Sequence, residues 1–456
     1  MTKKLEGIRK LLSLFILVTF LLETTVVAEV RMLQSIAPVR SSGTTHSASR
    51  AIPVASTAPA LPTPSPAAHS SASARPVGGT SGSPWMSPPP SSPTGTLGNL
   101  VRLSLSSDQE EGNRESEAPS SSADGRFVAF QSRASNLVPD DRNHKIDIFL
   151  RDEQTGDTIR VSVASDGTEG NNDSVSPSLS ADGRFVAFES KASNLVPGDT
   201  RDKRDIFVHD TATGETVRVS VASDGRQANK DSTAPSMSAD GRFVAFESKA
   251  TNLAPGVGNA KQQVFVHDRN TGETTLVSLS TSGAVANATS SAPAISSDGR
   301  HVAFVSMADN LVVLDRNHRQ DVFVHDRETG ETTRVSVAGD GSEGNRDSIS
   351  PAINGDGRFV AFASEAGNLV PGDANQKTDV FVHDRETGDT TRVSVSDDGE
   401  QGDRAGGAPS INASGRFVAF ESDATNLVED DRNKERDVFR SRSKPGAHHP
   451  AERLLA

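Results

Sequence analysis

A repeat of 58 residues constrains the fold of this chain more than any other feature of its sequence. In each copy a turn glycine is followed by Arg, then by Phe or His, and then by Val-Ala-Phe. The glycine recurs at Gly125, Gly183, Gly241, Gly299, Gly357 and Gly415. A period this regular predicts an array of one supersecondary unit. Function must therefore lie in a feature that the six copies, residues 99–442, create together.

The second copy shows the strands expected in each unit. Residues 176–180 and 184–190 predict a hairpin around an Asp-Gly turn. Residues 205–210 and 217–221 predict two further strands joined by a Thr-Gly turn, and no helical period occurs. The apolar run at 185–188 does not alternate, which is typical of a strand covered on both faces. We therefore predict an all-β fold, a six-bladed β-propeller of four-stranded antiparallel blades.

The two ends of the repeat region predict how the ring closes. The sixth copy stops after its third strand, at 437–440, whereas residues 100–105 correspond to the fourth strand of the other copies. Proteins generally cover unpaired sheet edges, because an open edge invites aggregation. We predict that the N-terminal strand at about 100–105 completes the sixth blade and closes the propeller.

The residues outside the repeats carry targeting and tether signals. Residues 1–28 combine a basic start, an apolar stretch and a small-residue cleavage site, which predicts a secretory signal peptide. The apolar part is shorter than the roughly 20 residues that span a bilayer, although an uncleaved anchor stays open. Residues 29–98 are rich in Pro, Ser, Ala and Thr and predict a disordered linker, and residues 443–456 form a polar tail. We expect export to the periplasm or the extracellular space, with no stable membrane span after cleavage.

Composition excludes several classes of function. The net charge of -13 argues against nucleic acid as a partner, because nucleic-acid binding needs a basic face. The chain has no cysteine, so it has neither disulfides nor a thiolate metal site. It has no tyrosine, which is the sialidase nucleophile, and no G-x-S-x-G context for a hydrolase serine. A metal-dependent lactonase or lyase stays open, because it needs only carboxylates, an Asn or His, and one cation.

The loop between the second and third strands carries the sharpest motif. An Asp and an Asn stand two residues apart, and a second Asp follows four residues later. Oxygen ligands at this spacing predict a site for a hard cation such as calcium. The alternative is that these side chains cap backbone amides where the loop enters a strand. The second copy has Arg201 between its Asp residues, and the third has Val257, Asn259 and Gln263, so we expect poor or no binding in both. The candidate ligands are Asp141, Asn143, Asp147, Asp315, Asn317, Asp321, Asp373, Asn375, Asp379, Asp431, Asn433 and Asp437.

Two other polar residues recur from copy to copy. An Asn precedes Leu at one position in every copy, which we interpret as a turn-fixing residue. A His ends the third strand in four copies, and such repetition favours packing or a hydrogen bond between blades over catalysis, which needs one unique constellation. The residues are Asn136, Asn194, Asn252, Asn310, Asn368 and Asn426, and His209, His267, His325 and His383.

The repeat unit resembles the WD-like propeller repeats of the TolB family of exported bacterial proteins. It reads S-P-S-x-S-x-D-G-R-x-V-A-F-x-S, followed by D-I-F-V-x-D and T-G-E-T-x-R-V-S, and the resemblance covers residues 99–442. It implies a periplasmic docking platform for proteins, without chemistry of its own. We therefore expect a monomeric, non-catalytic module that binds or scaffolds a protein partner through its long loops. The alternatives are the metal-dependent enzyme and a calcium-binding surface protein.

Overall fold

The computed structural model describes residues 101–199, 203–258, 261–429, 431 and 435–442. The predicted signal peptide (1–28), linker (29–98) and tail (443–456) lie outside these residues. The chain separates into two compact units, and the second, Arg31–Val101, is described only at Val101. The fold below is that of the described part of the first unit. No helix there is long and apolar enough to cross a bilayer.

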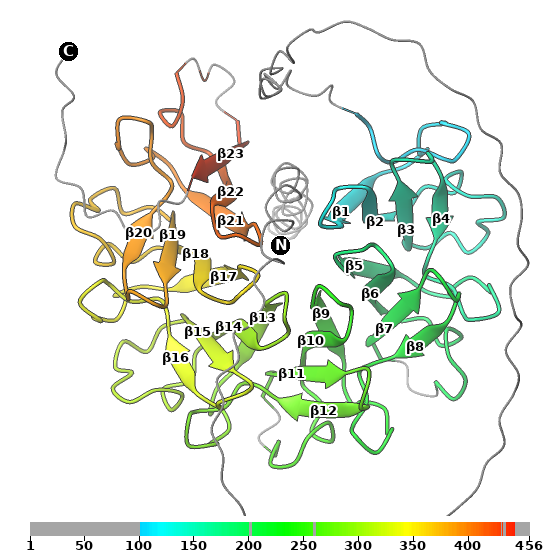
Figure 1. Cartoon of the computed structure of the whole chain (residues 1–456), viewed down its shortest axis with the longest axis horizontal. Coiled ribbons are helices and arrows are strands. Elements are labelled where there is room, and N and C mark those ends of the chain that lie inside the picture. Colours follow the sequence, from blue (N-terminus) through cyan, green and yellow to red (C-terminus); the bar gives the residue numbers. More distant parts are fainter. Residues whose placement is uncertain (1–100, 200–202, 259–260, 430, 432–434, 443–456) are drawn as a thin grey trace, which may run out of the picture. The chain divides into compact units, whose positions relative to one another are not determined.

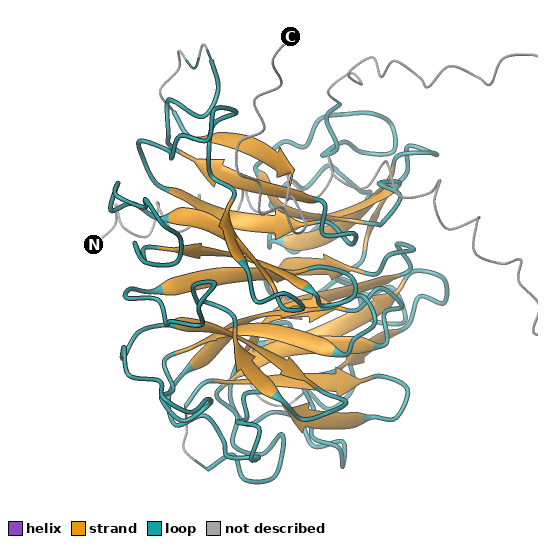
Figure 2. Cartoon of the chain, turned by 60° about the vertical axis from the view of Figure 1, so that its left-hand side comes forward, coloured by secondary structure: helices purple, strands orange, loops and turns teal. Residues whose placement is uncertain are grey.

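The described residues form six antiparallel sheets arranged as the blades of a propeller (Figure 1, Figure 2). The first blade comprises β1 (Ser116–Ser121), β2 (Phe127–Ser132), β3 (Asp147–Asp152) and β4 (Thr158–Arg160). The second comprises β5 (Ser174–Leu179), β6 (Phe185–Ser190), β7 (Asp205–Asp210) and β8 (Thr216–Arg218). The third comprises β9 (Ser232–Met237), β10 (Phe243–Ser248), β11 (Gln263–Asp268) and β12 (Glu273–Leu276). The fourth comprises β13 (Ser290–Ile295), β14 (His301–Ser306), β15 (Asp321–Asp326) and β16 (Thr332–Arg334). The fifth comprises β17 (Ser348–Ile353), β18 (Phe359–Ser364), β19 (Asp379–Asp384) and β20 (Thr390–Arg392), and the sixth comprises β21 (Gly406–Ile411), β22 (Phe417–Ser422) and β23 (Asp437–Arg442).

Each blade is a meander whose strands follow the order of the chain. In the first blade the Ser122 hydroxyl donates to Asp124 over 2.6 Å and accepts from the amide of Phe127 over 2.9 Å, which closes the turn between β1 and β2. The rings of Phe130 and Phe149 then stack across β2 and β3, with centroids 5.9 Å apart. Every blade repeats this ring pair. The predicted all-β, six-bladed propeller is confirmed.

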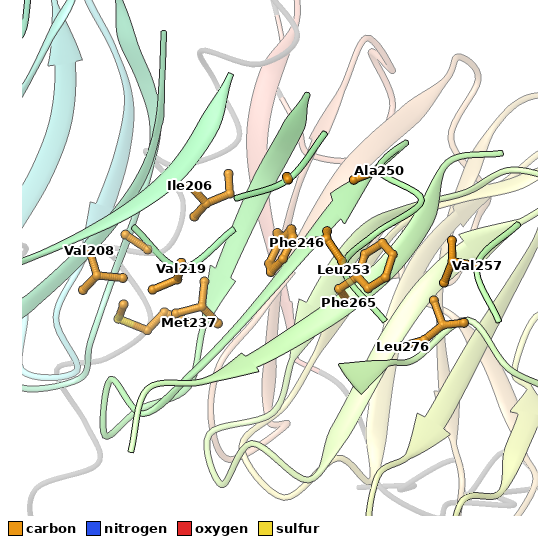
Figure 3. Packing of buried hydrophobic residues seen from close by; sticks show 13 residues of the cluster. Ile206, Val208, Val219, Met237, Phe246, Ala250, Leu253, Val257, Phe265 and Leu276 are labelled. Atoms are coloured by element: carbon orange, nitrogen blue, oxygen red, sulfur yellow. The ribbon is translucent and has the colours of Figure 1, made fainter. Parts of the chain in front are cut away.

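The hydrophobic core lies between neighbouring blades. Figure 3 shows one cluster, in which Ile206 and Val208 of the second blade lie near Met237 and Phe246 of the third. The stacked rings of these blades, Phe188 with Phe207 and Phe246 with Phe265, are fully buried. In the second to fifth blades the apolar runs do not alternate because the middle strands have a blade on either side, as the sequence predicts.

The predicted closure of the ring by residues 100–105 is wrong. The sixth sheet has three strands in the described residues, and 101–105 form no strand beside β23. Instead, Leu105 forms an isolated bridge with Glu111, and its carbonyl accepts the Thr158 hydroxyl of the first blade over 2.6 Å. Val163 binds Thr216 of the second blade in the same way. Leu105 therefore makes the contact of a crossing segment with the blade that follows it, and Figure 1 shows the first and last blades apart.

Candidate functional site

The two long loops of each unit lie together on one face of the propeller, which we call the long-loop face. One loop joins the second and third strands, and the other crosses to the next blade. In the first unit the Asn136 side chain accepts from the amide of Asn113 over 2.8 Å and donates to the carbonyl of Glu111 over 2.7 Å. The other units repeat these bonds. The recurring asparagines therefore fix the loops, as predicted.

The structure brings the aspartates of the D-x-N motif together around an arginine from the fourth strand. The Arg160 guanidinium lies 3.4 Å from Asp141, 3.9 Å from Asp147 and 2.9 Å from Glu169. The side-chain amide of Asn143 donates to Asp147 over 2.7 Å. The side-chain oxygen of Asn143 accepts from the backbone amide of Lys145 over 2.7 Å. The motif thus caps the loop while Arg160 supplies the positive charge.

The same cluster occurs in the second, fourth and fifth blades. Arg218 lies 3.2 Å from Asp199, Arg334 lies 3.3 Å from Asp315, and Arg392 lies 3.3 Å from Asp373. Burial, partly offset by hydrogen bonds and the arginine, raises the pKa of Asp147, and of its counterpart Asp205, to about 6. Burial also raises the pKa of Asp315 to about 6. The side chains of Asp147 and Asp315 are 0% and 4% exposed, and such burial disfavours the charged form of a carboxyl group.

The third blade replaces the whole cluster at once. Val257 stands in place of the first aspartate, Gln263 in place of the second, and Leu276 in place of the arginine. Gln263 accepts the Ser278 hydroxyl over 2.6 Å, as the aspartate does in the other blades. Both aspartates and the arginine are replaced together in this blade. The comparison of repeats therefore indicates that the three charged residues depend on one another.

The calcium prediction for these loops stays a prediction. Within the described ranges, no group of three or more His, Asp or Glu side chains is arranged to hold a metal ion. In the sixth unit Asp431 and Asp437 are described, whereas Asn433 lies outside the described residues. Calorimetry with calcium against a chelator measures the affinity directly. A saturable heat would support calcium binding, and its absence would contradict it.

The recurring histidines have a structural role, as predicted, but each bonds a threonine of its own blade, and the threonine makes the bond to the preceding crossing segment. In the fourth blade the Thr332 hydroxyl donates to the carbonyl of Leu279 in the preceding crossing segment. Its oxygen therefore accepts from His325 Nδ1, at 2.8 Å. Burial lowers the pKa of His325 to about 4, so the ring is neutral near pH 7. In the first blade Arg151 stands at the position of the histidine, and it donates to the Thr158 hydroxyl over 3.1 Å.

The buried histidines should make stability depend on pH. The pKa of His325 is lowered from 6.5 unfolded to about 4 folded, so its contribution is complete above pH 6.5 and lost as the pH falls toward 4. We expect the difference in unfolding free energy between wild type and His325→Asn to shrink by about 3 kcal/mol across this range. Urea denaturation at several pH values measures this difference. A constant difference would show that the ring does not titrate as its burial requires.

The inner strands line a cavity of about 780 Å³ at the centre of the propeller. Each inner strand bulges at a small residue before a proline, such as Ala234 with φ 53. The amide of Ala234 donates to Glu189 of the preceding blade over 3.2 Å, and Ala292 donates to Glu247 over 2.8 Å. Val305 and Ala363 occupy the place of this glutamate in the fourth and fifth blades. The cavity lining consists mainly of Ala, Ser, Pro and Ile from the inner strands, and its charged residues are Glu421 and Arg436, which form an ion pair.

The loop between β14 and β15 of the fourth blade exposes three apolar side chains, Met307, Val313 and Leu314, which we call the apolar patch. These side chains are 54%, 88% and 63% exposed. The other five units have a charged residue at the position of Met307. Four of them have Pro followed by Asp or Gly at the positions of Val313 and Leu314. Leu314 adopts φ 69, a conformation that the equivalent glycines adopt without strain. The sequence signal is VVLD at 312–315 in place of VPGD, and sequence reasoning missed it because repetition drew attention to the shared residues.

No family model matches this sequence, and no curated protein matches it. Among solved structures, TolB from Acinetobacter baumannii is similar at 16% identity and TM-score 0.37, over 66% of this chain and 60% of that chain. A putative TolB from Agrobacterium tumefaciens is similar at 17% identity and TM-score 0.38, over 61% of this chain and 80% of that chain. An oligogalacturonate lyase in complex with manganese is similar at 15% identity and TM-score 0.40, over 65% and 67%.

These likenesses concern the fold alone. This chain spans 60% of the length of the Acinetobacter TolB. The propeller seen here is the fold that the TolB-like repeats predict. Because the similar structures include a lyase as well as TolB proteins, they do not separate a docking module from an enzyme.

Proposed function

We propose that this chain is an exported, non-catalytic propeller that binds a protein partner in the cell envelope or outside the cell. The observation that carries the proposal is the apolar patch of Met307, Val313 and Leu314 on the fourth blade. Exposed apolar side chains gathered on one loop are typical of protein interaction sites. The contact surface is the long-loop face around this patch.

Two features of the patch are unfavourable for the stability of the fold. A leucine in the left-handed conformation costs about 1–2 kcal/mol relative to glycine, and Leu314 takes that conformation. The side chains of Val313 and Leu314 also stay in water. The first, second, third and fifth blades adopt this conformation with Asp or Gly, so the fold does not require a leucine there, and its strain at an exposed position supports a functional role. The exposed Arg316 and Arg319 flank the patch and favour a partner with an acidic rim.

Site-specific crosslinking tests the proposed surface. A photoreactive amino acid at Val313 should capture one discrete partner in cells that produce the protein. The matched control carries the same amino acid at Pro371, the equivalent position of the fifth blade. An adduct from position 313 alone supports the proposal. Equal adducts from both positions, or none, would contradict it. Fractionation of the same cells tests export.

Restoring the repeat sequence should separate binding from stability. The double variant Val313→Pro, Leu314→Gly gives the fourth blade the loop of the second, Pro197-Gly198. We expect it to raise the unfolding free energy by about 1 kcal/mol, because glycine relieves the strain at a positive φ. We also expect it to lose the partner. Chemical denaturation and capture of the crosslinked partner measure the two effects. A stabilised variant that still binds would show that the contact lies elsewhere.

A further inference from the structure

The turns between the first two strands of neighbouring blades are joined by a series of backbone hydrogen bonds. The amide of Ala123 in the first blade donates to the carbonyl of Ala181 in the second over 2.8 Å, and the amide of Ala181 donates to the carbonyl of Ala239 in the third over 2.9 Å. The same bond joins the third blade to the fourth, the fourth to the fifth and the fifth to the sixth, where the carbonyl of Ala413 accepts. Among the described residues, no such bond joins the amide of Ala413 to the carbonyl of Ala123. The two ends of the series thus lie on the sixth and first blades.

At the joints between the first four blades, the inner hairpins add two side-chain bonds. At the first joint the side chain of Gln131 accepts the amide of Ser176 over 2.9 Å, and the hydroxyl of Ser120 accepts the amide of Leu179 over 3.1 Å. The next two joints repeat both bonds, with a glutamate in place of the glutamine. The fourth and fifth blades have apolar residues at both acceptor positions, so the joints that follow them lack both bonds.

The sixth blade has both acceptors again, at Glu421 and Ser410. The side chain of Glu421 is 3% exposed and lies 3.4 Å from Arg436, as Glu189 lies 3.0 Å from Arg204 in the second blade. Glu189 uses its second carboxylate oxygen for an amide of the next blade, whereas the Oε1 atom of Glu421 is buried and accepts no hydrogen bond from the described residues. A buried acceptor without a donor is unfavourable, because its bonds to water are lost. Glu421 and Ser410 are therefore placed to bind a blade that follows the sixth.

We propose that the propeller closes reversibly, and that in the closed state the sixth blade packs directly on the first. The carboxylate of Glu421 then accepts the amide of Ala118, and the hydroxyl of Ser410 accepts the amide of Ser121, as their equivalents do at the first joint. The turn bond from the amide of Ala413 to the first blade completes the series. This closure needs no additional strand. It goes beyond the proposed partner binding, because it involves the inner hairpins and not the apolar patch.

The structure shows the open state. Figure 1 shows the first and last blades apart, and the described strands of these two blades lack the mutual packing that neighbouring blades have. Because no crossing segment of the described chain ties these two blades, this is the joint where a local opening breaks the fewest contacts. Ala118 and Ser120 line the central cavity from one side of the joint, and Gly407 and Ser410 line it from the other. Opening therefore gives access to the cavity from the side, and closure removes it.

Two introduced cysteines test for the closed state, because the chain has none of its own. In the full chain, Ala123→Cys with Ala413→Cys should form a disulfide within one molecule under mild oxidation. The matched control is Ala181→Cys with Ala239→Cys, whose positions are equivalent and whose backbones are bonded in the structure. A closed state populated at about 10% or less gives a disulfide that forms about tenfold or more slowly than the control. Non-reducing electrophoresis and mass spectrometry follow both reactions.

Three results of this experiment would overturn the proposal. A disulfide in the control pair alone would show that the closed state does not form. A disulfide between two molecules would show that the first and sixth blades join separate copies of the chain. Equal rates for the two pairs would show that the joint is permanently closed and does not open.

Substitutions at Glu421 test the bond that holds the closed state. Glu421→Ala should slow the disulfide between positions 123 and 413 about tenfold, because a hydrogen bond to a charged acceptor is lost. Glu421→Gln should slow it less, since Gln131 shows that an amide oxygen can accept this bond. Neither substitution should change the rate of the control pair. Equal rates for the two Glu421 variants would show that Glu421 does not accept an amide of the first blade.

Discussion

Replacing Arg334 with leucine is expected to lower the unfolding free energy by about 3–5 kcal/mol, because it leaves buried carboxylates without their cation. Arg334 lies 3.3 Å from Asp315, 3.5 Å from Asp321 and 2.9 Å from Glu343. The pKa of Asp315 is already raised to about 6 by burial, and loss of the arginine raises it further. The deficit should therefore be largest near neutral pH and shrink as the pH falls and the carboxyls protonate. Urea denaturation at pH 7.5 and pH 5 measures both effects.

The third blade provides the matched control for this experiment. A variant that combines Arg334→Leu with Asp315→Val, Asp321→Gln and Glu343→Val reproduces its residues Leu276, Val257, Gln263 and Val285. We expect this variant to regain most of the lost stability, because well-packed apolar groups replace buried ion clusters with little or no loss. If the fourfold variant is no more stable than Arg334→Leu, the residues of the third blade cannot replace the charged cluster of the fourth. That outcome would contradict the inference that the cluster acts as one unit.

Replacing Gly241 with alanine is expected to destabilise the protein by about 2–4 kcal/mol, more than a positive φ alone explains. Gly241 adopts φ 70 in the Asp-Gly turn of the third blade. A Cβ atom there would meet the side chain of Phe185 in the preceding blade, 3.0 Å from its Cβ atom. The expected loss adds about 1–2 kcal/mol for the left-handed conformation to about 1–3 kcal/mol for overpacking. Chemical denaturation measures it.

Gly225 separates these two causes. It has φ 81, and a Cβ atom at this position would meet nothing within 4 Å. Gly225→Ala should therefore lose only the conformational part, about 1–2 kcal/mol. Equal losses at Gly225 and Gly241 would show that the contact with Phe185 contributes nothing.

The repeated residues and the unrepeated ones have different roles in this molecule. The residues that recur in most copies, such as Asn136, His325 and Asp315, all take part in hydrogen bonds or ion pairs that hold loops and blades together. The candidate contacts arise where one blade departs from the others. Among the described residues, Val313 and Leu314 in the fourth blade and the three-stranded sheet of the sixth are the clearest departures.

Much of the fold was predictable from sequence because its signals are local and occur six times. The turn glycine, the apolar runs and the strand order specify a blade within 58 residues, and the copies specify how many blades there are. The structural roles of Asn136 and His325 were also predictable, because a catalytic residue is not needed in several blades at once.

Only the tertiary structure decided how the blades meet, since contacts between blades join residues far apart in the chain. The arginine that neutralises Asp315 comes from a different strand, 19 residues on, and its pairing with the D-x-N loop is visible only in space. The carbonyl of Leu105 accepts from Thr158, more than 50 residues away, and this contact joins the N-terminal segment to the first blade. The sequence alone determined that the chain forms six like blades, because local pattern dictates local structure. The tertiary structure determined which surfaces those blades leave uncovered, because burial is a property of the assembled fold.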